Sequence, residues 1–74
     1  MGLVEQLAAA QLPPPGMRKS IRETAGASLR DIGSELGVTP MTVLRWERGE
    51  AEPRRDRAIA YRALLDALDK GHWR

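Results

Sequence analysis

The sequence predicts an all-α fold: a compact bundle of four to five short helices that contains a helix-turn-helix. Glycine and proline recur at short intervals, and the stretches between them carry apolar residues at the helical spacing of three or four. No stretch shows the strict alternation of apolar and polar residues that a half-buried strand needs. The 74 residues are enough for one small domain with a single core.

Four parts are expected to follow one another along the chain. Leu3, Leu7 and Ala10 recur at helical spacing with Val4 beside them, which predicts a first amphipathic helix. The proline run after it is stiff and extended, so it is expected to separate this helix from the rest. The N-terminal helix, proline-rich linker, helix-turn-helix domain and C-terminal tail are expected over residues 1–12, 13–16, 17–69 and 70–74. The apolar residues of the first helix need a cover, either the core or a second copy of the chain.

Two helices open the main domain. Met17, Ile21 and Ala25 fall on one face of a helix that the following glycine is placed to stop. Ser28 is suited to cap the next helix, because its hydroxyl can accept from the backbone of Asp31 while the Asp31 carboxylate reaches back. Both helices are therefore expected to have well-defined ends.

The inner face of this second helix carries Leu29, Ile32 and Leu36. Gly33 lies inside the helix, where glycine costs about 1 kcal/mol relative to alanine. Its presence predicts the close approach of another helix at this point. Gly37 is placed to end the helix.

The next helix is short and has strong start signals. Thr39 caps it, and Pro40 occupies the first helical position, where its missing N–H costs nothing. Val38 before the cap and Val43 at the fourth helical position can form a hydrophobic staple. Because Val43 and Trp46 are three residues apart, they are expected to share the inward face.

The other face of that helix carries Met41, Thr42 and Arg45, which a small core cannot use. Two helices of about eight residues joined by a tight glycine turn have the layout of a helix-turn-helix. Its second helix is short and exposed because the major groove is about 12 Å wide and only the first turns reach base edges. This outer face is therefore expected to meet solvent or a ligand.

A last helix is expected from Asp56, as its cap, to about Asp69. A group of apolar residues marks its inner face, with Ile59 and Leu64 flanking them. The inner residues are Ala58, Tyr61, Leu65 and Leu68.

Composition narrows the classes of function. With no cysteine and a single His72, neither a disulfide framework nor a zinc site is expected. The chain has no apolar run long enough for a membrane span and no secretory signal at its start, so a cytoplasmic protein is expected. Nucleophile–base pairs, paired carboxylates and a glycine-rich phosphate loop are missing, so neither an enzyme nor a cofactor is expected. A formal charge of +2 does not by itself indicate nucleic acid.

The stretch SLRDIGSELGVTPMTVLRWERGEAEPR, residues 28–54, resembles the lambda-repressor-like, Cro-like (XRE) helix-turn-helix family. The resemblance extends over residues 17 to about 69. In the family a small residue lies inside the first motif helix, a glycine makes the turn, and an aromatic or aliphatic residue, a glutamate and a later glycine end the second helix. The matching residues here are Gly33, Gly37, Trp46, Glu47 and Gly49.

The resemblance implies that the start of the second motif helix faces bases and phosphates. The residues so placed are Thr39, Pro40, Met41, Thr42 and Arg45. Pro40 and Met41 stand where the family usually has a glutamine pair, so its adenine-reading contacts are replaced here. Met41 is instead expected against a thymine methyl, and Arg45 is suited to pair with O6 and N7 of guanine.

Further roles follow from the same resemblance. Arg48, Arg54 and Arg55 match a region that approaches phosphates or the minor groove, and Ser28 begins a helix whose backbone N–H groups suit a phosphate. Family members also pair an arginine of the first helix with the glutamate after the recognition helix. Arg22 and Glu47 match that structural ion pair.

The function expected first is a sequence-specific transcriptional regulator that binds double-stranded DNA, of the small repressor type. The resemblance also implies an origin in a phage or another mobile element. An excisionase-like or MerR-like winged helix-turn-helix is a second hypothesis, and it requires a two-stranded wing after the recognition helix. A helical module that binds a protein partner is the third. The sequence leaves the oligomeric state open, although a palindromic DNA site would call for a homodimer.

Overall fold

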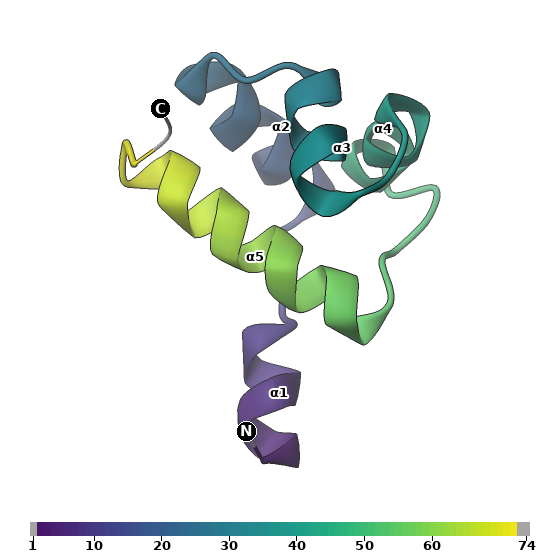
Figure 1. The fold of residues 1–74 in the computed structure, drawn as a ribbon, viewed down its shortest axis with the longest axis vertical. Coiled ribbons are helices and arrows are strands. Elements are labelled where there is room, and N and C mark those ends of the chain that lie inside the picture. The colour runs from purple at the N-terminus through teal and green to yellow at the C-terminus, as the bar shows by residue number, and fades with distance from the viewer. Residues whose placement is uncertain (1, 73–74) are drawn as a thin grey trace.

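The computed structural model describes residues 2–72, and that part of the chain folds into five α-helices without a strand (Figure 1). The helices are α1 (Leu3–Ala9), α2 (Pro15–Ala25), α3 (Leu29–Leu36), α4 (Pro40–Arg48) and α5 (Arg55–Asp69). The predicted all-α fold is confirmed. Within residues 2–72 no two-stranded wing is formed, because the loop after α4 leads directly into α5.

The helices lie on two sides of α5. Figure 1 shows α2, α3 and α4 grouped on one side of α5, with α1 projecting on the other. Helix α3 packs against α4 as the helix-turn-helix, while α2 packs against both α4 and α5. The motif is therefore held by two other helices, since α2 packs against α4 and α5 packs against α3.

The core lies between α5 and the motif. Ile32, Val43, Trp46 and Tyr61 are buried, together with Leu65 and Leu68 further along α5. Leu29 and Leu36 are half-buried and pack against this cluster. The rings of Trp46 and Tyr61 lie 5.0 Å apart between centroids and are tilted by 37°, a favourable aromatic arrangement. The inward faces predicted for α3, α4 and α5 are confirmed.

The local caps form as the sequence predicts. Ser28 and Asp31 make the full capping box of α3, and Thr39 accepts from the backbone N–H of Thr42 at 3.2 Å to cap α4. Gly37 ends α3 with φ of 70°, a left-handed conformation that other residues adopt only at a cost. The start of the recognition helix is thereby fixed within three residues of the end of α3.

Gly33 is required by the turn rather than by a second helix. A Cβ added at Gly33 would lie 2.6 Å from the carbonyl oxygen of Val38 and 3.3 Å from the carbonyl carbon of Thr39. The backbone that approaches is the segment that leads into α4. The expected close approach is present, but its partner is the turn of the motif.

Three element boundaries differ from expectation. Helix α2 begins at Pro15 rather than at Met17, because proline suits the first position of a helix. Helix α1 ends at Ala9, three residues before the expected end. Asp56 is not the cap of α5: Arg54 holds that position without a side-chain hydrogen bond, and Asp56 lies in the first turn, where its charge favours the helix dipole.

One apolar residue of α2 was placed wrongly by its spacing, and the apolar residues of α1 remain largely uncovered. Met17 is 53% exposed although it continues the apolar face of Ile21 and Ala25. The reason is that α2 turns a face with two arginines toward α4, as described below. In α1, Leu3, Val4 and Leu7 remain 61%, 76% and 49% exposed. Residues 73 and 74 of the expected tail lie outside the described residues.

Helix α1 packs against α5 and against no other helix in residues 2–72. The guanidinium of Arg62 in α5 donates to the carbonyl of Ala8, and Leu12 after the helix packs against the core. The N-terminal helix is thus attached to the bundle, while its most apolar residues stay in contact with solvent.

Candidate nucleic-acid interface

The outer face of α4 is the candidate binding surface. Thr39, Pro40, Met41 and Arg45 are exposed, and Thr42 is half-buried. Met41 in particular is 56% exposed. None of these side chains is packed into the core, so all five stay where a ligand can reach them.

Arg45 carries the largest number of hydrogen-bond donors on this face. Its side chain makes no hydrogen bond or ion pair with any of residues 2–72. A guanidinium carries five N–H donors in a planar fork, and none of them is used by an acceptor within residues 2–72. The side chain can therefore give two parallel hydrogen bonds to one acceptor edge.

Thr39 and Thr42 form a small polar pair at the start of the helix. Their hydroxyl oxygens lie 2.9 Å apart, and either one can be the donor. One hydroxyl proton is used within the pair, and the other remains available. The pair can therefore give one hydrogen bond to a phosphate or base without losing the cap.

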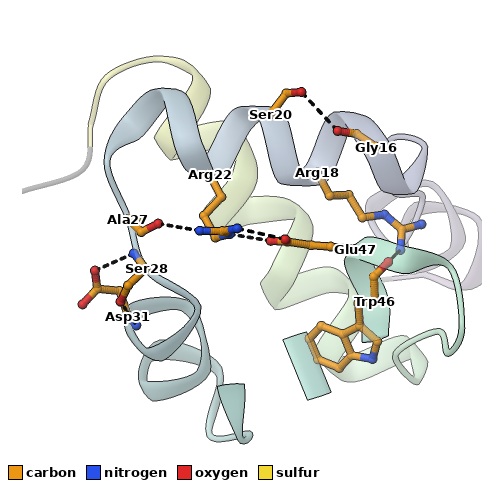
Figure 2. Close-up of polar contacts among 9 residues, drawn as sticks. All are labelled: Gly16, Arg18, Ser20, Arg22, Ala27, Ser28, Asp31, Trp46 and Glu47. Carbon is orange, nitrogen blue, oxygen red and sulfur yellow. Dashed lines mark hydrogen bonds and ion pairs between the residues drawn. The ribbon is translucent and has the colours of Figure 1, made fainter. Parts of the chain in front are cut away.

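Glu47 anchors the inner side of α4 to α2 (Figure 2). Arg22 Nε donates to Glu47 Oε2 at 2.6 Å, and its Nη2 donates to Oε1 at 3.0 Å. The Glu47 side chain is 2% exposed, so the pair is shielded from water. The Glu47 carboxylate raises the pKa of Arg22, chiefly through these hydrogen bonds and against the opposing effect of burial.

The same arginine also secures the entrance of the motif. Arg22 Nη1 donates to the carbonyl of Ala27 at 3.0 Å, just before the cap of α3. One guanidinium therefore connects α2 with the start of α3 and the end of α4. Figure 2 shows this arrangement, with Arg22 between Ala27 and Glu47. The ion pair implied by the family resemblance is formed.

Arg18 is the residue that sequence reasoning missed. It is 4% exposed and reaches the last turn of α4, where its Nη1 donates to the carbonyl of Trp46 at 3.1 Å. Its spacing of one helical turn from Arg22 was the available signal, since residues four apart share a helix face. The apolar spacing of Met17 and Ile21 indicated a different face and hid it.

The predicted phosphate contacts fall into two groups. The N–H of Ser28 donates to Asp31 Oδ2 at 2.8 Å, so that amide is already occupied, although the Ser28 side chain is exposed. Arg48 is exposed and lies 3.7 Å from Glu50, a surface ion pair that contributes little. Arg54 and Arg55 are exposed at the start of α5, with no hydrogen bond or ion pair from their side chains to residues 2–72.

Five helices, a capped turn between α3 and α4, and an exposed cationic outer face define a helix-turn-helix protein. A model of a helix-turn-helix domain family matches residues 19–70, which is the greater part of the chain. The chain belongs to this helix-turn-helix family, of the XRE or Cro-like type, and carries a DNA-binding domain. No curated protein and no solved structure matches it.

Two kinds of feature, a membrane-spanning helix and a metal-binding cluster, are absent from the described residues. No helix in residues 2–72 is long and apolar enough to cross a membrane. Within the same range, no three histidine, cysteine, aspartate or glutamate residues come together as a metal site. Domains of this family are typically not enzymes.

Proposed function

We propose that this protein is a sequence-specific regulator of transcription that places α4 in the major groove of double-stranded DNA, in the manner of a small repressor. The observation that carries the proposal is the state of Arg45. It is an exposed arginine without a protein partner, on a helix whose other face is buried through Val43, Trp46 and Glu47. A rigid helix that presents free donors is what base recognition needs.

The proposed base contacts lie in the first two turns of α4. Arg45 is suited to guanine, because its fork matches the O6 and N7 acceptors. Met41 brings an apolar surface that suits the methyl group of thymine, and Pro40 beside it presents no N–H that would need a partner. Thr39 and Thr42 supply the single hydroxyl proton described above. The expected half-site therefore contains guanine and thymine at neighbouring positions.

Contacts to the DNA backbone come from a second set of residues. Arg48, Arg54 and Arg55 are exposed on either side of the loop between α4 and α5, and the Ser28 hydroxyl is exposed at the start of α3. Each arginine that neutralises a phosphate releases counterions, which makes the affinity fall as salt rises. A palindromic site with half-sites about 34 Å apart would bind two copies of the chain. A regulator of this kind acts in the cytoplasm.

Selection of bound sites from a random duplex pool tests the proposal. We expect a short enriched sequence containing guanine, and retention in a gel that weakens steeply between about 50 and 200 mM salt. Enrichment of two inverted half-sites would identify a homodimer on DNA. No enrichment together with salt-independent retention would refute the proposed function.

One observation favours a second candidate, a helical module for binding a protein partner. The apolar residues Leu3, Val4 and Leu7 of α1 are exposed, and α4 does not contact this helix. The same pool separates the two candidates, because a protein-binding module would show no preference among duplexes. DNA binding is the function that the described surface supports better, since the free arginines lie on and beside α4.

A further inference from the structure

Arg18 is a buried cation that the proposed function does not use. Its guanidinium makes polar contacts with three segments. Nε donates to the carbonyl of Pro13 at 2.7 Å, and Nη1 donates to the carbonyl of Trp46 at 3.1 Å. Nη1 and Nη2 also reach the two carboxylate oxygens of Glu52, at 3.3 and 3.2 Å. Four polar contacts on one buried guanidinium indicate that this arrangement is a specific part of the fold.

The position at the end of α4 gives Arg18 a physical role. Carbonyl groups in the last turn of a helix lack partners within the helix and carry the negative end of its dipole. The Trp46 carbonyl accepts one hydrogen bond from the N–H of Gly49, and the buried Arg18 guanidinium adds a second hydrogen bond and a positive charge at this end of the helix. Figure 2 shows Arg18 reaching from α2 to this carbonyl, one turn along from the Arg22–Glu47 pair.

Glu52 extends this contact into the loop between α4 and α5, residues 49–54. The loop is held at three points. A Cβ at Gly49 would lie 3.3 Å from Cγ of Pro15, so the loop starts in close contact with α2. Ala51 packs against the core, and Glu52 binds Arg18. Directly after these points the chain reaches Arg54 and Arg55.

We propose that Arg18 is a positioning residue for DNA binding, an inference that rests on the proposed function. By binding the Trp46 carbonyl and Glu52 together, it fixes the direction in which the loop leaves α4. Arg45 on α4 and the arginines where the loop joins α5, Arg54 and Arg55, can then engage one DNA site at the same time. Without Arg18 the loop samples other paths, so Arg54 and Arg55 are no longer held where they can neutralise phosphates while Arg45 is bound.

An Arg18→Met variant tests this role because it keeps an apolar stem and removes the guanidinium. The variant is expected to fold, since the Glu52 side chain is 58% exposed and is not stranded, and the Trp46 carbonyl keeps the N–H of Gly49 at 3.3 Å. Arg62→Met is the matched control. Arg62 also binds a backbone carbonyl and a carboxylate, those of Ala8 and Asp66, but on the side of α5 that faces α1.

The first measurement is the affinity for the selected duplex against salt, at a temperature where a urea titration shows each variant folded. For each phosphate that the protein no longer neutralises, we expect Arg18→Met to bind about tenfold more weakly at 0.1 M salt. The slope of log affinity against log salt should become smaller by about 1 for each such phosphate. Arg62→Met should match the wild type. An unchanged slope, or a weakening no larger than the unfolded fraction explains, would overturn the proposal.

Amide hydrogen exchange at Gly49 and Glu50, whose N–H groups donate to the carbonyls of Trp46 and Arg45, gives a second readout without DNA. Exchange should become faster in Arg18→Met and stay unchanged in Arg62→Met, because the loop loses one of its anchors only in the former. Unchanged exchange would refute the positioning role whatever the DNA result. If the wild-type protein bound no duplex, the proposed function would be refuted, and with it any role of Arg18 in DNA binding. The exchange result would still report whether Arg18 holds the loop.

Discussion

The two faces of α4 differ in how far their hydrogen-bonding capacity is met. On the inner face, the Glu47 carboxylate is bound by Arg22 and the Trp46 carbonyl by Arg18. On the outer face, Arg45 has no partner among residues 2–72. One helix of nine residues thus carries a satisfied side and an unsatisfied side.

This difference separates the residues that stabilise the fold from those whose hydrogen-bonding groups remain available to a ligand. A buried group that loses its partner is penalised at once, because water cannot replace that partner. An exposed donor without a protein partner is bound by water and can exchange it for DNA. Substitutions on the inner face should therefore change the free energy of unfolding, and those on the outer face should change DNA binding alone.

The largest effect is expected for Glu47→Ala on the inner face. The substitution leaves the Arg22 guanidinium without its counter-charge in a shielded site, which costs about 3 to 5 kcal/mol of unfolding free energy. Urea denaturation measures this loss. Glu50→Ala removes an equal charge from an exposed pair and should change the free energy by less than about 1 kcal/mol. Equal effects of the two substitutions would contradict the proposed difference between the faces.

We expect the protein to lose stability at high pH because of Tyr61, which packs on Trp46. Burial, with a smaller contribution from the Glu47 charge, raises the pKa of Tyr61 from 10.0 to about 12. The folded chain therefore holds the proton more tightly than the unfolded chain. The resulting stabilisation is complete below about pH 10 and lost as pH rises toward about 12, by an amount on the order of 2 kcal/mol.

Denaturation curves between pH 9 and about 12 measure this dependence, with Tyr61→Phe as the control. The variant should lose the part of the pH dependence that belongs to Tyr61. It should also be no less stable than wild type at pH 7, because the Tyr61 hydroxyl is buried without a hydrogen-bond partner in residues 2–72. The same pH profile for both proteins would show that Tyr61 is not responsible.

Arg45→Ala is the decisive substitution on the outer face. It should weaken binding to the selected site by about 1 to 3 kcal/mol and relax the preference at one base pair, with the free energy of unfolding unchanged. Titration of matched and mismatched duplexes measures both quantities. Lys70→Ala removes the same charge from the far end of α5 and should affect all duplexes only weakly. If Arg45→Ala destabilised the fold instead, the outer face would have a structural role.

The smallest effect is expected where α3 meets the start of α4. Gly33→Ala should lower the free energy of unfolding by about 1 to 2 kcal/mol, because the added Cβ meets the backbone carbonyl of Val38 and outweighs the gain in helix propensity. Gly16→Ala is the control, since a Cβ there meets nothing within 4 Å and should be neutral or stabilising. A stabilising Gly33→Ala would show that the turn can shift.

Much of this structure was predictable from the sequence because its signals are local. The capping box of Ser28 and Asp31 and the cap at Thr39 each involve residues three apart. The inward faces of α3 to α5 follow from helical spacing. The exposure of Met41 and Arg45 followed from the same spacing, whereas Thr42 on that face is half-buried. The Arg22–Glu47 pair followed from the family resemblance.

Other features could not be predicted because they depend on segments far apart in the sequence. Apolar spacing predicted that Met17 faces inward, but packing against α4 buries Arg18 and leaves Met17 exposed. The Trp46 carbonyl of α4 lies 28 residues away from Arg18, and Glu52 lies 34 away. No local pattern encodes which carbonyl or carboxylate will be near.

Local signals in the sequence are thus enough to specify where each helix of the motif starts and stops and which face of α4 is apolar. Which cations bind acceptors inside the protein and which remain available to DNA depends on tertiary packing. The physical reason is range: caps and apolar periodicity act within one or two turns, whereas the partner of a charged side chain is set by how whole helices pack.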